Sequence, residues 1–196
     1  MRECILASAS PRRRELLERL GVKFEVFVPD VDEQSDERDP ERLSEELSAR
    51  KGRAARRLLT AEGRELSGRL LIASDTVVAA GEKLLGKPRD RADALRMLRL
   101  LQGRRHRVVS GIYLCLDGTE ALSHAITEVE FAPMSEGEIA AYVDTGEPFG
   151  KAGAYAIQGL AAMFIRGIHG DYCNVVGLPV NRMCELFSEK FRENFI

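Results

Sequence analysis

The sequence lacks tryptophan, and aromatic residues make up only 6% of its 196 residues. Proteins that bind single-stranded nucleic acid stack bases on aromatic side chains, so few such platforms are available to the basic residues Arg53, Arg56, Arg57 and 104–107. Acidic and basic side chains nearly cancel, at a formal net charge of -2. No overall field therefore favours duplex nucleic acid or an anionic membrane. We expect neither partner, and any anion site must be local.

Long apolar runs and paired cysteines are also missing. The longest apolar stretch, within residues 70–80, is interrupted by Ser74 and Asp75 and stays far below the roughly 20 residues that span a bilayer. The four cysteines contain no C-x-x-C pair, and the N-terminus shows no apolar segment of a signal peptide. These absences predict a soluble protein of the reduced cytoplasm. The length favours a single domain over residues 1–196.

Motifs of zinc chemistry and of covalent catalysis are absent as well. The three histidines lie far apart, without H-x-x-x-H or H-E-x-x-H spacing, which argues against a zinc site. No G-x-S-x-G segment and no Cys/His pairing indicates a covalent nucleophile. Any catalysis is therefore expected to use a metal and water.

Hydrophobic periodicity and turn residues predict strands interleaved with helices. Expected strands cover residues 4–7, 22–28, 70–74, 106–116, 121–131 and 163–168. Expected helices cover residues 11–20, 40–59, 91–101 and 136–144, with a last helix within 175–187. Asp117-Gly118 predicts a hairpin turn, and Ser135 with Glu138 predicts a capping box. This order predicts an α/β domain on a mixed sheet.

The first candidate site is the segment 8–14, S-A-S-P-R-R-R, where a strand ends and a helix begins. Backbone N–H groups of a helix N-terminus, hydroxyls and guanidiniums together can hold a phosphate. The alternative is that Ser10 only caps the helix and the arginines are solvated. Cations in the first turn oppose the helix dipole at about 0.3 to 1 kcal/mol each, so Arg12 and Arg13 are locally unfavourable unless an anion binds.

The second candidate is Asp75, placed directly after the expected strand 70–74. Open α/β sheets commonly bind ligands there, and a carboxylate at that position can hold a metal or orient a water. An ordinary turn aspartate is the commoner explanation of an isolated S-D-T string. Asp32, Glu33 and Asp36 in the acidic loop could supply further oxygens for Mg²⁺, or could simply be solvated.

The segment 81–88, G-E-K-L-L-G-K-P, matches the first seven positions of a P-loop and fails at the eighth. Pro88 replaces the hydroxyl residue that binds Mg²⁺, and no clean strand is expected before Gly81. A P-loop nucleoside triphosphatase is therefore rejected. Lys87 stays a candidate phosphate ligand, although a lysine in a turn is usually just exposed.

The fourth candidate is the glycine-rich segment 146–159. Its glycines would let the backbone approach a ligand, and the Gln158 amide offers both a donor and an acceptor to a base edge, so the segment could recognise a pyrimidine. It could equally be a long turn with Tyr155 and Ile157 in the core.

Taken in order, these segments resemble the Maf family of nucleotide pyrophosphatases from residue 6 to about 187. The matching strings are L-A-S-A-S-P-R-R at 6–13, A-R-K at 49–51, S-D-T at 74–76, G-K-P at 86–88, K-A-G-A-Y-A-I-Q-G at 151–159 and N-V-V-G-L-P at 174–179. The resemblance implies a two-lobed α/β fold similar to inosine triphosphate pyrophosphatases, with a central substrate cleft. It also implies hydrolysis of nucleoside triphosphates to the monophosphate and pyrophosphate.

Site roles follow from the same resemblance, motif by motif. The expected triphosphate ligands are Ser8, Arg12, Arg13, Lys51 and Lys87. Asp75 is expected to activate the attacking water, and Arg12, Thr76 and Gln158 to select the base. A divalent cation, Mg²⁺ or Mn²⁺, is implied as cofactor, with Asp75 and Glu33 as its expected ligands.

The strings at 74–76 and 153–159 look like the branch of the family that acts on dTTP, UTP and modified uridine triphosphates. Two departures bear on the pocket: Ala156 stands where that branch more often has Gly, and Gly52 where Ala is more usual. The resemblance further implies a homodimer and a link to arrest of septum formation. An alternative is a nucleotide-binding regulator of cell division without significant turnover, which would bind nucleotide tightly and hydrolyse none.

Overall fold

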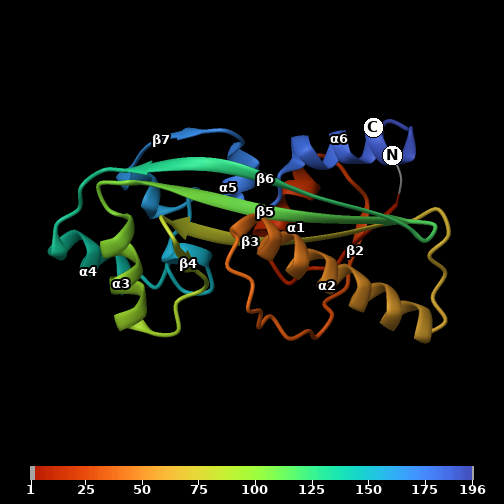
Figure 1. The fold of residues 1–196 in the computed structure, drawn as a ribbon, viewed down its shortest axis with the longest axis horizontal. Coiled ribbons are helices and arrows are strands. Elements are labelled where there is room, and N and C mark those ends of the chain that lie inside the picture. Colours follow the sequence, from red (N-terminus) through yellow and green to blue (C-terminus); the bar gives the residue numbers. More distant parts are fainter. Residues whose placement is uncertain (1–2, 196) are drawn as a thin grey trace.

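A mixed sheet of seven strands organises the computed structural model, which describes residues 3–195 (Figure 1). The strands are β1 (Cys4–Leu6), β2 (Phe24–Val26), β3 (Leu70–Ala80), β4 (Lys83–Leu85), β5 (Arg105–Leu116), β6 (Thr119–Phe131) and β7 (Ile165–His169). Their order is β2-β1-β3-β5-β6-β7, with β4 pairing with β3. β1 runs parallel to β2 and β3, and the other pairs are antiparallel. The predicted mixed sheet is confirmed.

Helices lie on both sides of this sheet (Figure 1). They are α1 (Pro11–Arg19), α2 (Pro40–Ala61), α3 (Arg91–Leu101), α4 (Glu136–Asp144), α5 (Tyr172–Val176) and α6 (Val180–Phe191), with the short 3₁₀ helices η1 (Ala152–Ala154) and η2 (Leu160–Phe164). Within residues 3–195, none of these helices is long and apolar enough to cross a membrane. The capping box of Ser135 and Glu138 at the start of α4 is confirmed.

The β5–β6 hairpin is the longest feature of the sheet. Its turn has positive φ at both Asp117 (48°) and Gly118 (83°), and Leu116 pairs with Thr119 across it. A two-residue turn of this kind matches the twist of the flanking strands and needs positive φ at both positions. The predicted hairpin is confirmed, and its strands run through both halves of the molecule (Figure 1).

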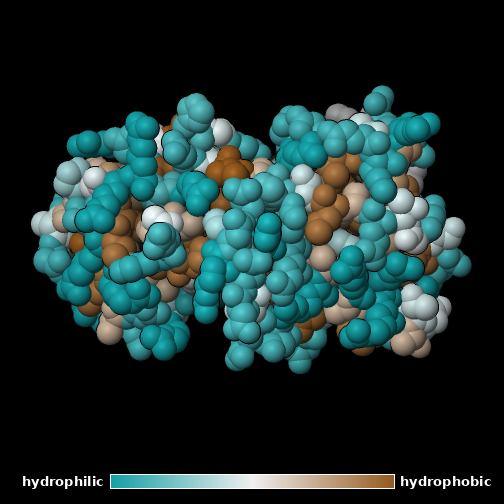
Figure 2. Space-filling view, viewed as in Figure 1, coloured by the Kyte–Doolittle hydropathy of each residue, from teal (hydrophilic) through white to brown (hydrophobic). Residues whose placement is uncertain are grey.

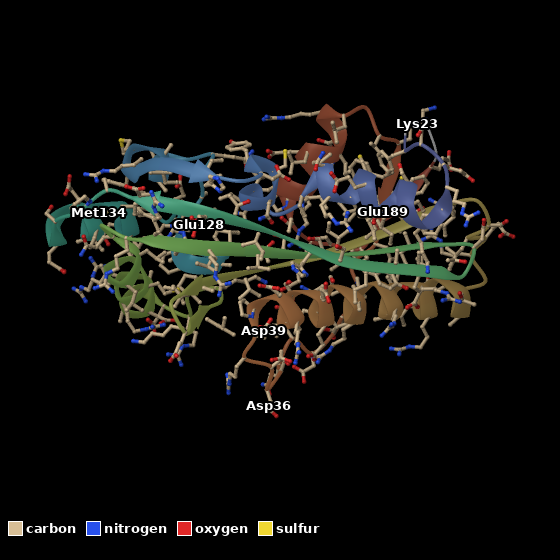
Figure 3. The ribbon with its side chains drawn as sticks, turned by 45° about the horizontal axis from the view of Figure 1, so that its top comes forward. Lys23, Asp36, Asp39, Glu128, Met134 and Glu189 are labelled. Atoms are coloured by element: carbon tan, nitrogen blue, oxygen red, sulfur yellow. The ribbon has the colours of Figure 1, made fainter. Side chains whose placement is uncertain are left out.

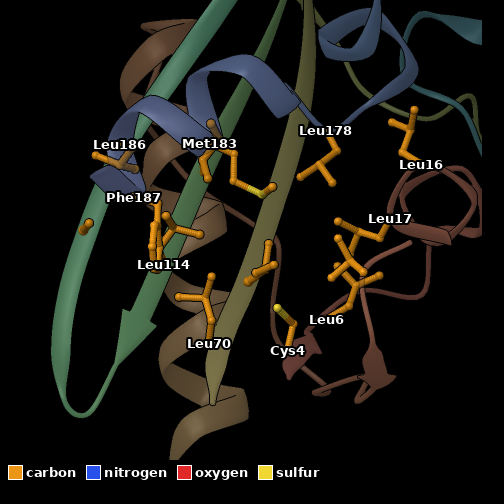
Figure 4. Close-up of a cluster of buried hydrophobic side chains, with 14 of the residues drawn as sticks. Cys4, Leu6, Leu16, Leu17, Leu70, Leu114, Leu178, Met183, Leu186 and Phe187 are labelled. Atoms are coloured by element: carbon orange, nitrogen blue, oxygen red, sulfur yellow. The ribbon is translucent and has the colours of Figure 1, made fainter. Parts of the chain in front are cut away.

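Alternate residues of the central strands face opposite helical layers. Ile5, Leu71 and Tyr113 pack against α2 in one buried cluster. Their sequence neighbours face α1 and α6, where Leu6, Leu17, Leu70, Leu114, Met183 and Phe187 form a second cluster (Figure 4). This period-2 alternation is what a sheet covered on both faces requires.

A third cluster fills the other end of the long strands. Val78, Val108 and Phe131 pack there with residues of α3, α4 and η1. The ribbon shows these elements, with β4 and β7, gathered apart from α1, α2 and α6 (Figure 1). The space-filling view shows a notch between the two halves and a mainly hydrophilic face (Figure 2). The molecule is therefore two-lobed, and one continuous sheet joins the lobes.

The structure corrects two expectations about strands. β3 does not end at Ser74 but continues to Ala80, because β5 pairs with it residue by residue from Leu71 to Ala79. Asp75 therefore lies within a strand, opposite Gly111. A clean strand does precede Gly81, contrary to the sequence interpretation, yet the segment that follows is a hairpin into β4 and not a phosphate loop.

Candidate active site

A cleft of about 590 Å³ lies between the two lobes. Every residue to which the family resemblance assigns a role lines it: Ser8, Arg12, Arg13, Glu33, Lys51, Asp75, Thr76, Lys87 and Gln158. They come from the segment after β1, the first turn of α1, the loop before α2, the middle of α2, β3, the segment after β4 and the segment between η1 and η2. The volume is in the range of small-molecule sites.

The sheet topology opens this cleft beside Asp75. β1 ends at Leu6, which pairs with Ile72 of its parallel neighbour β3. Residues 74–76 of β3 therefore run past the end of β1, where the chain turns through Ser8 into α1. The sequence predicts the site at the carboxyl end of the strand that contains residues 70–74. The cleft does lie at the carboxyl end of a parallel strand, as expected for an open sheet, but that strand is β1 and not β3.

Lys51 lies at the centre of a charged cluster in the cleft. Its ammonium group forms ion pairs with Asp75 and with Glu33, whose Oε1 is 2.7 Å away, and Lys87 Nζ lies 3.7 Å from Glu33 Oε2. The Lys51 and Asp75 side chains are each only 13% exposed. Burial alone would raise the pKa of Glu33, but the hydrogen bonds and charges of the two lysines outweigh it and hold that pKa below its ordinary value.

Arg13 is held by three partners at the base of α1. Its Nε donates to Gly177 O (2.6 Å), and its terminal nitrogens donate to Ser8 Oγ and Thr76 Oγ1 (both 3.0 Å). Arg13 is 8% exposed, and burial lowers its pKa, although the Asp75 carboxylate opposes this. A guanidinium so placed keeps its charge, because arginine starts from a pKa above 12.

Arg12 is held less tightly than its neighbour. Its Nε donates to Val176 O at 3.3 Å, and within residues 3–195 its terminal nitrogens make no other hydrogen bond. Burial lowers its pKa, and Glu15 partly offsets this. Ser10 occupies the N-cap position of α1 without a side-chain cap hydrogen bond. The alternative of a serine cap followed by solvated arginines is therefore wrong.

The glycine-rich segment combines both interpretations of its sequence. Tyr155 is buried and hydrogen-bonded to His106 Nε2 at 2.8 Å, as the core alternative expected, while Gln158 is exposed and lines the cleft. The carboxylate of Glu147 anchors the segment, since it accepts hydrogen bonds from the backbone N–H of Leu160 (2.8 Å) and Ala161 (3.2 Å). Gln158 is thus presented from a fixed loop.

A family model described as Maf-like protein matches residues 3–190. The chain belongs to the Maf family. Several Maf relatives bear the name dTTP/UTP pyrophosphatase. One from Symbiobacterium thermophilum is 46% identical over 96% of this chain and 94% of its own. One from Desulforamulus reducens is 47% identical over 94% of this chain and 95% of its own.

Among solved structures, a nucleoside-triphosphatase/dITP/XTP pyrophosphatase from Mycobacterium abscessus aligns with 67% of this chain and 74% of its own. The TM-score is 0.38 and the identity 19%. So weak a likeness says nothing about the substrate of this Maf protein.

One residue of the cleft escaped sequence reasoning. Lys151 lines the cleft, and its pKa is lowered by burial and by the nearby charge of Arg12. The signal was a lysine within a motif considered only for its glycines and its glutamine. The expectation that Gly52 bears on the pocket is wrong, because Gly52 does not line the cleft. It lies against the sheet, where a Cβ would sit 2.0 Å from the Tyr113 ring. This departure from the usual family residue fits the packing of α2 onto β5.

Of the three acidic-loop carboxylates named as possible metal ligands, only Glu33 lines the cleft. Asp36 lies at the outer tip of the loop and points away from the sheet (Figure 3). Asp32 is exposed and accepts a hydrogen bond from Gln34 N at 2.9 Å, whereas Glu33 reaches Lys51. Among residues 3–195, no group of three or more His, Cys, Asp or Glu side chains could hold a metal ion by itself.

Asp75 and Glu33 nevertheless fit a divalent metal shared with a substrate. Their carboxylates converge on one cation, the Lys51 ammonium, so two hard oxygen donors already meet at one point. Mg²⁺ is typically held by one or two carboxylates together with substrate phosphates and waters, not by a full protein cage. The donor set therefore suits the implied cofactor.

Proposed function

We propose that this chain hydrolyses nucleoside triphosphates to the monophosphate and pyrophosphate. The observation that carries the proposal is the convergence of Asp75, Lys51 and the two α1 arginines on one cleft. Five cationic and three anionic side chains line that cleft, a local excess of positive charge on a chain whose formal net charge is -2. Such a site is complementary to a polyphosphate and not to a neutral ligand.

Phosphate oxygens would meet the cations from three sides. Arg12 and Arg13 approach from α1, Lys51 from α2 and Lys87 from beyond β4. The free terminal nitrogens of Arg12 suit a bidentate contact with a phosphate, while the lysines act as point charges. Ser8 Oγ, which receives a hydrogen bond from Arg13, lies at the same wall.

Asp75 is the proposed base for the attacking water. Its Oδ1 binds Lys51, which fixes the carboxylate and leaves Oδ2 to accept a proton. The water oxygen bonds to the α-phosphorus as the bond from that phosphorus to the bridging oxygen breaks, and pyrophosphate leaves with the bond's electron pair. The water's proton passes to Asp75. Lys51, Lys87 and the arginines neutralise the charge that develops on the phosphate oxygens.

A divalent cation held by Asp75 and Glu33 would neutralise phosphate charge and polarise the reacting phosphorus–oxygen bonds. We propose dTTP and UTP as the preferred substrates, because the relatives bear the name dTTP/UTP pyrophosphatase. Gln158, which lines the cleft, offers an amide to the edge of their pyrimidine bases. Thr76 supports this preference less directly, since its hydroxyl already binds Arg13 and Ser110.

Replacement of the proposed base tests this reaction. Asp75→Asn keeps the shape of the side chain but cannot accept a proton, so we expect pyrophosphate release to fall about 10²- to 10⁴-fold. Nucleotide binding, measured by calorimetry, should persist because the cationic wall remains. Asp36→Asn, in the exposed loop, is the matched control and should keep full activity. Full activity of Asp75→Asn would remove Asp75 from the mechanism.

A further inference from the structure

The segment N-V-V-G-L-P, residues 174–179, plays no part in the proposed chemical step, yet it contacts both arginines of the cleft. Val176 O accepts a hydrogen bond from Arg12 Nε at 3.3 Å, and Gly177 O accepts one from Arg13 Nε at 2.6 Å. Gly177 O also accepts one from Ser74 Oγ at 3.2 Å. The consecutive carbonyls of Val176 and Gly177 therefore each bind the Nε of one of the two neighbouring guanidiniums.

The backbone of this turn is itself fixed. α5 ends at Val176, and Gly177 has a φ of 123°, which side chains other than glycine rarely tolerate. The N–H groups of Gly177 and Leu178 both bind Cys173 O at 3.0 Å. The carbonyl groups that face the arginines thus have one defined direction.

Asn174 ties the turn to the sheet. It is fully buried, and its Nδ2 donates to Val108 O (3.0 Å) and to Thr127 Oγ1 (2.9 Å), which connects α5 with β5 and β6. Its backbone O accepts a hydrogen bond from Ser110 Oγ at 3.2 Å. The buried Asn174 amide therefore fixes the position of α5, and with it the turn, together with the two hydrogen bonds between Thr127 Oγ1 and the backbone of Asp171 (both 3.0 Å).

A second path leads from the same residue back to the cleft. Ser110 Oγ lies 2.9 Å from Thr76 Oγ1, which accepts a hydrogen bond from Arg13 at 3.0 Å. Asn174 is therefore connected to Arg13 from two directions, through the Gly177 carbonyl and through the Ser110 and Thr76 hydroxyls. A guanidinium has a rigid planar fork, so fixing one edge fixes the direction of the others.

We infer that Asn174 is a positioning residue that sets Arg12 and Arg13 for phosphate through the carbonyls of Val176 and Gly177. The inference rests on the proposed function in one respect, that the arginines bind substrate phosphates. It gives the N-V-V-G-L-P motif, of which Val175, Val176 and Gly177 line the cleft, a role in positioning the two arginines. The carbonyls also offset the charge of two cations placed at the positive end of the α1 dipole.

Asn174→Asp tests the inference, because it preserves the shape of the side chain but removes both donated hydrogen bonds. Binding of inorganic pyrophosphate, which engages only the cationic wall, should weaken about tenfold, the effect of losing one charge-assisted hydrogen bond. Binding of the nucleoside uridine, which carries no phosphate, should be unchanged. Equal weakening of both ligands would show general damage and overturn the inference. Ser48→Ala, a buried serine on α2 outside the network, is the control.

A double-mutant cycle isolates the path through the arginines. In a variant that already carries Arg12→Ala and Arg13→Ala, Asn174→Asp should have no further effect on pyrophosphate binding. A tenfold effect in that background as well would overturn the inference. If Asn174→Asp does not fold, Ser110→Ala replaces it in both experiments, with a smaller loss expected in the same direction. Unchanged pyrophosphate binding in Ser110→Ala would then count against the inference.

These measurements separate the inference from the proposed function. Pyrophosphate binding that depends on Asn174, in a protein that hydrolyses no triphosphate, supports the inference and refutes the function. If the wild type hydrolyses triphosphates and Asn174→Asp leaves pyrophosphate binding unchanged, the proposed function is supported and the inference is refuted.

Discussion

We predict that His106 makes the stability of this protein sensitive to mild acid. The ring is 3% exposed, its Nε2 binds Tyr155 Oη, and its Nδ1 is buried without a hydrogen-bond partner. Burial lowers the pKa of His106 to about 4, against about 6.5 in an unfolded chain. The folded protein therefore keeps the ring neutral at pH values where the unfolded chain protonates it.

The sign and size of the effect follow from that difference. Between about pH 6.5 and about pH 4 the unfolded state binds a proton that the folded state does not, so the free energy of unfolding falls as the pH falls. The loss begins below about pH 6.5, reaches about 2 kcal/mol near pH 5 and approaches about 3 kcal/mol below pH 4. Carboxylates titrate mainly below about pH 5, so the upper part of this window isolates the histidine.

His106→Gln removes the titrating group and keeps an amide that can reach Tyr155. Urea unfolding from about pH 7 to about pH 5 should show a loss of about 2 kcal/mol for the wild type and a much flatter profile for His106→Gln. His169→Gln, an exposed histidine on β7, is the matched control and should behave like the wild type. Parallel profiles for the wild type and His106→Gln would refute the reasoning.

Two further predictions concern packing and binding. Gly52→Ala places a Cβ 2.0 Å from the Tyr113 ring. A helical alanine gains up to about 1 kcal/mol, but overpacking typically costs about 1 to 3 kcal/mol, so the urea midpoint should fall; an equal or higher midpoint would contradict the tight contact. Lys151 is one of the five cations that line the cleft, so we expect it to contact a substrate phosphate. Lys151→Met should then lower kcat/KM for pyrophosphate release at least about tenfold, because a charged phosphate contact is worth about 1.5 to 3 kcal/mol. Lys190→Met, at the exposed end of α6, is its control; an unaltered kcat/KM for Lys151→Met would exclude the lysine from binding.

Features set by neighbouring residues could be predicted from the sequence. The Asp117-Gly118 hairpin and the capping box at Ser135 were predicted correctly, because both depend on conformational preferences and hydrogen bonds within a few residues. The end of β3 could not be predicted from the sequence. The polar residues 74–76 looked like the end of a buried strand, but the hydrogen bonds that extend β3 come from β5, some 35 residues later.

The candidate site shows the same division. Motifs identified which segments carry site residues, and the structure brings all of them to one cleft. It could not be foreseen that Lys51 pairs with Asp75 or that Arg13 binds Gly177, 164 residues away. Such contacts depend on how α2 and α5 pack on the sheet. The Thr76 hydroxyl is another example, because it forms hydrogen bonds with Arg13 and Ser110 that no local sequence pattern indicates.

Pyrophosphate release from dTTP, UTP, CTP, ATP, GTP and 7-methyl-GTP, with Mg²⁺ or Mn²⁺ and with chelator, tests the central claim most directly. The account predicts metal-dependent hydrolysis with one pyrophosphate per monophosphate, fastest for dTTP and UTP. Tight nucleotide binding without hydrolysis under either metal, or release of inorganic phosphate in place of pyrophosphate, would contradict it.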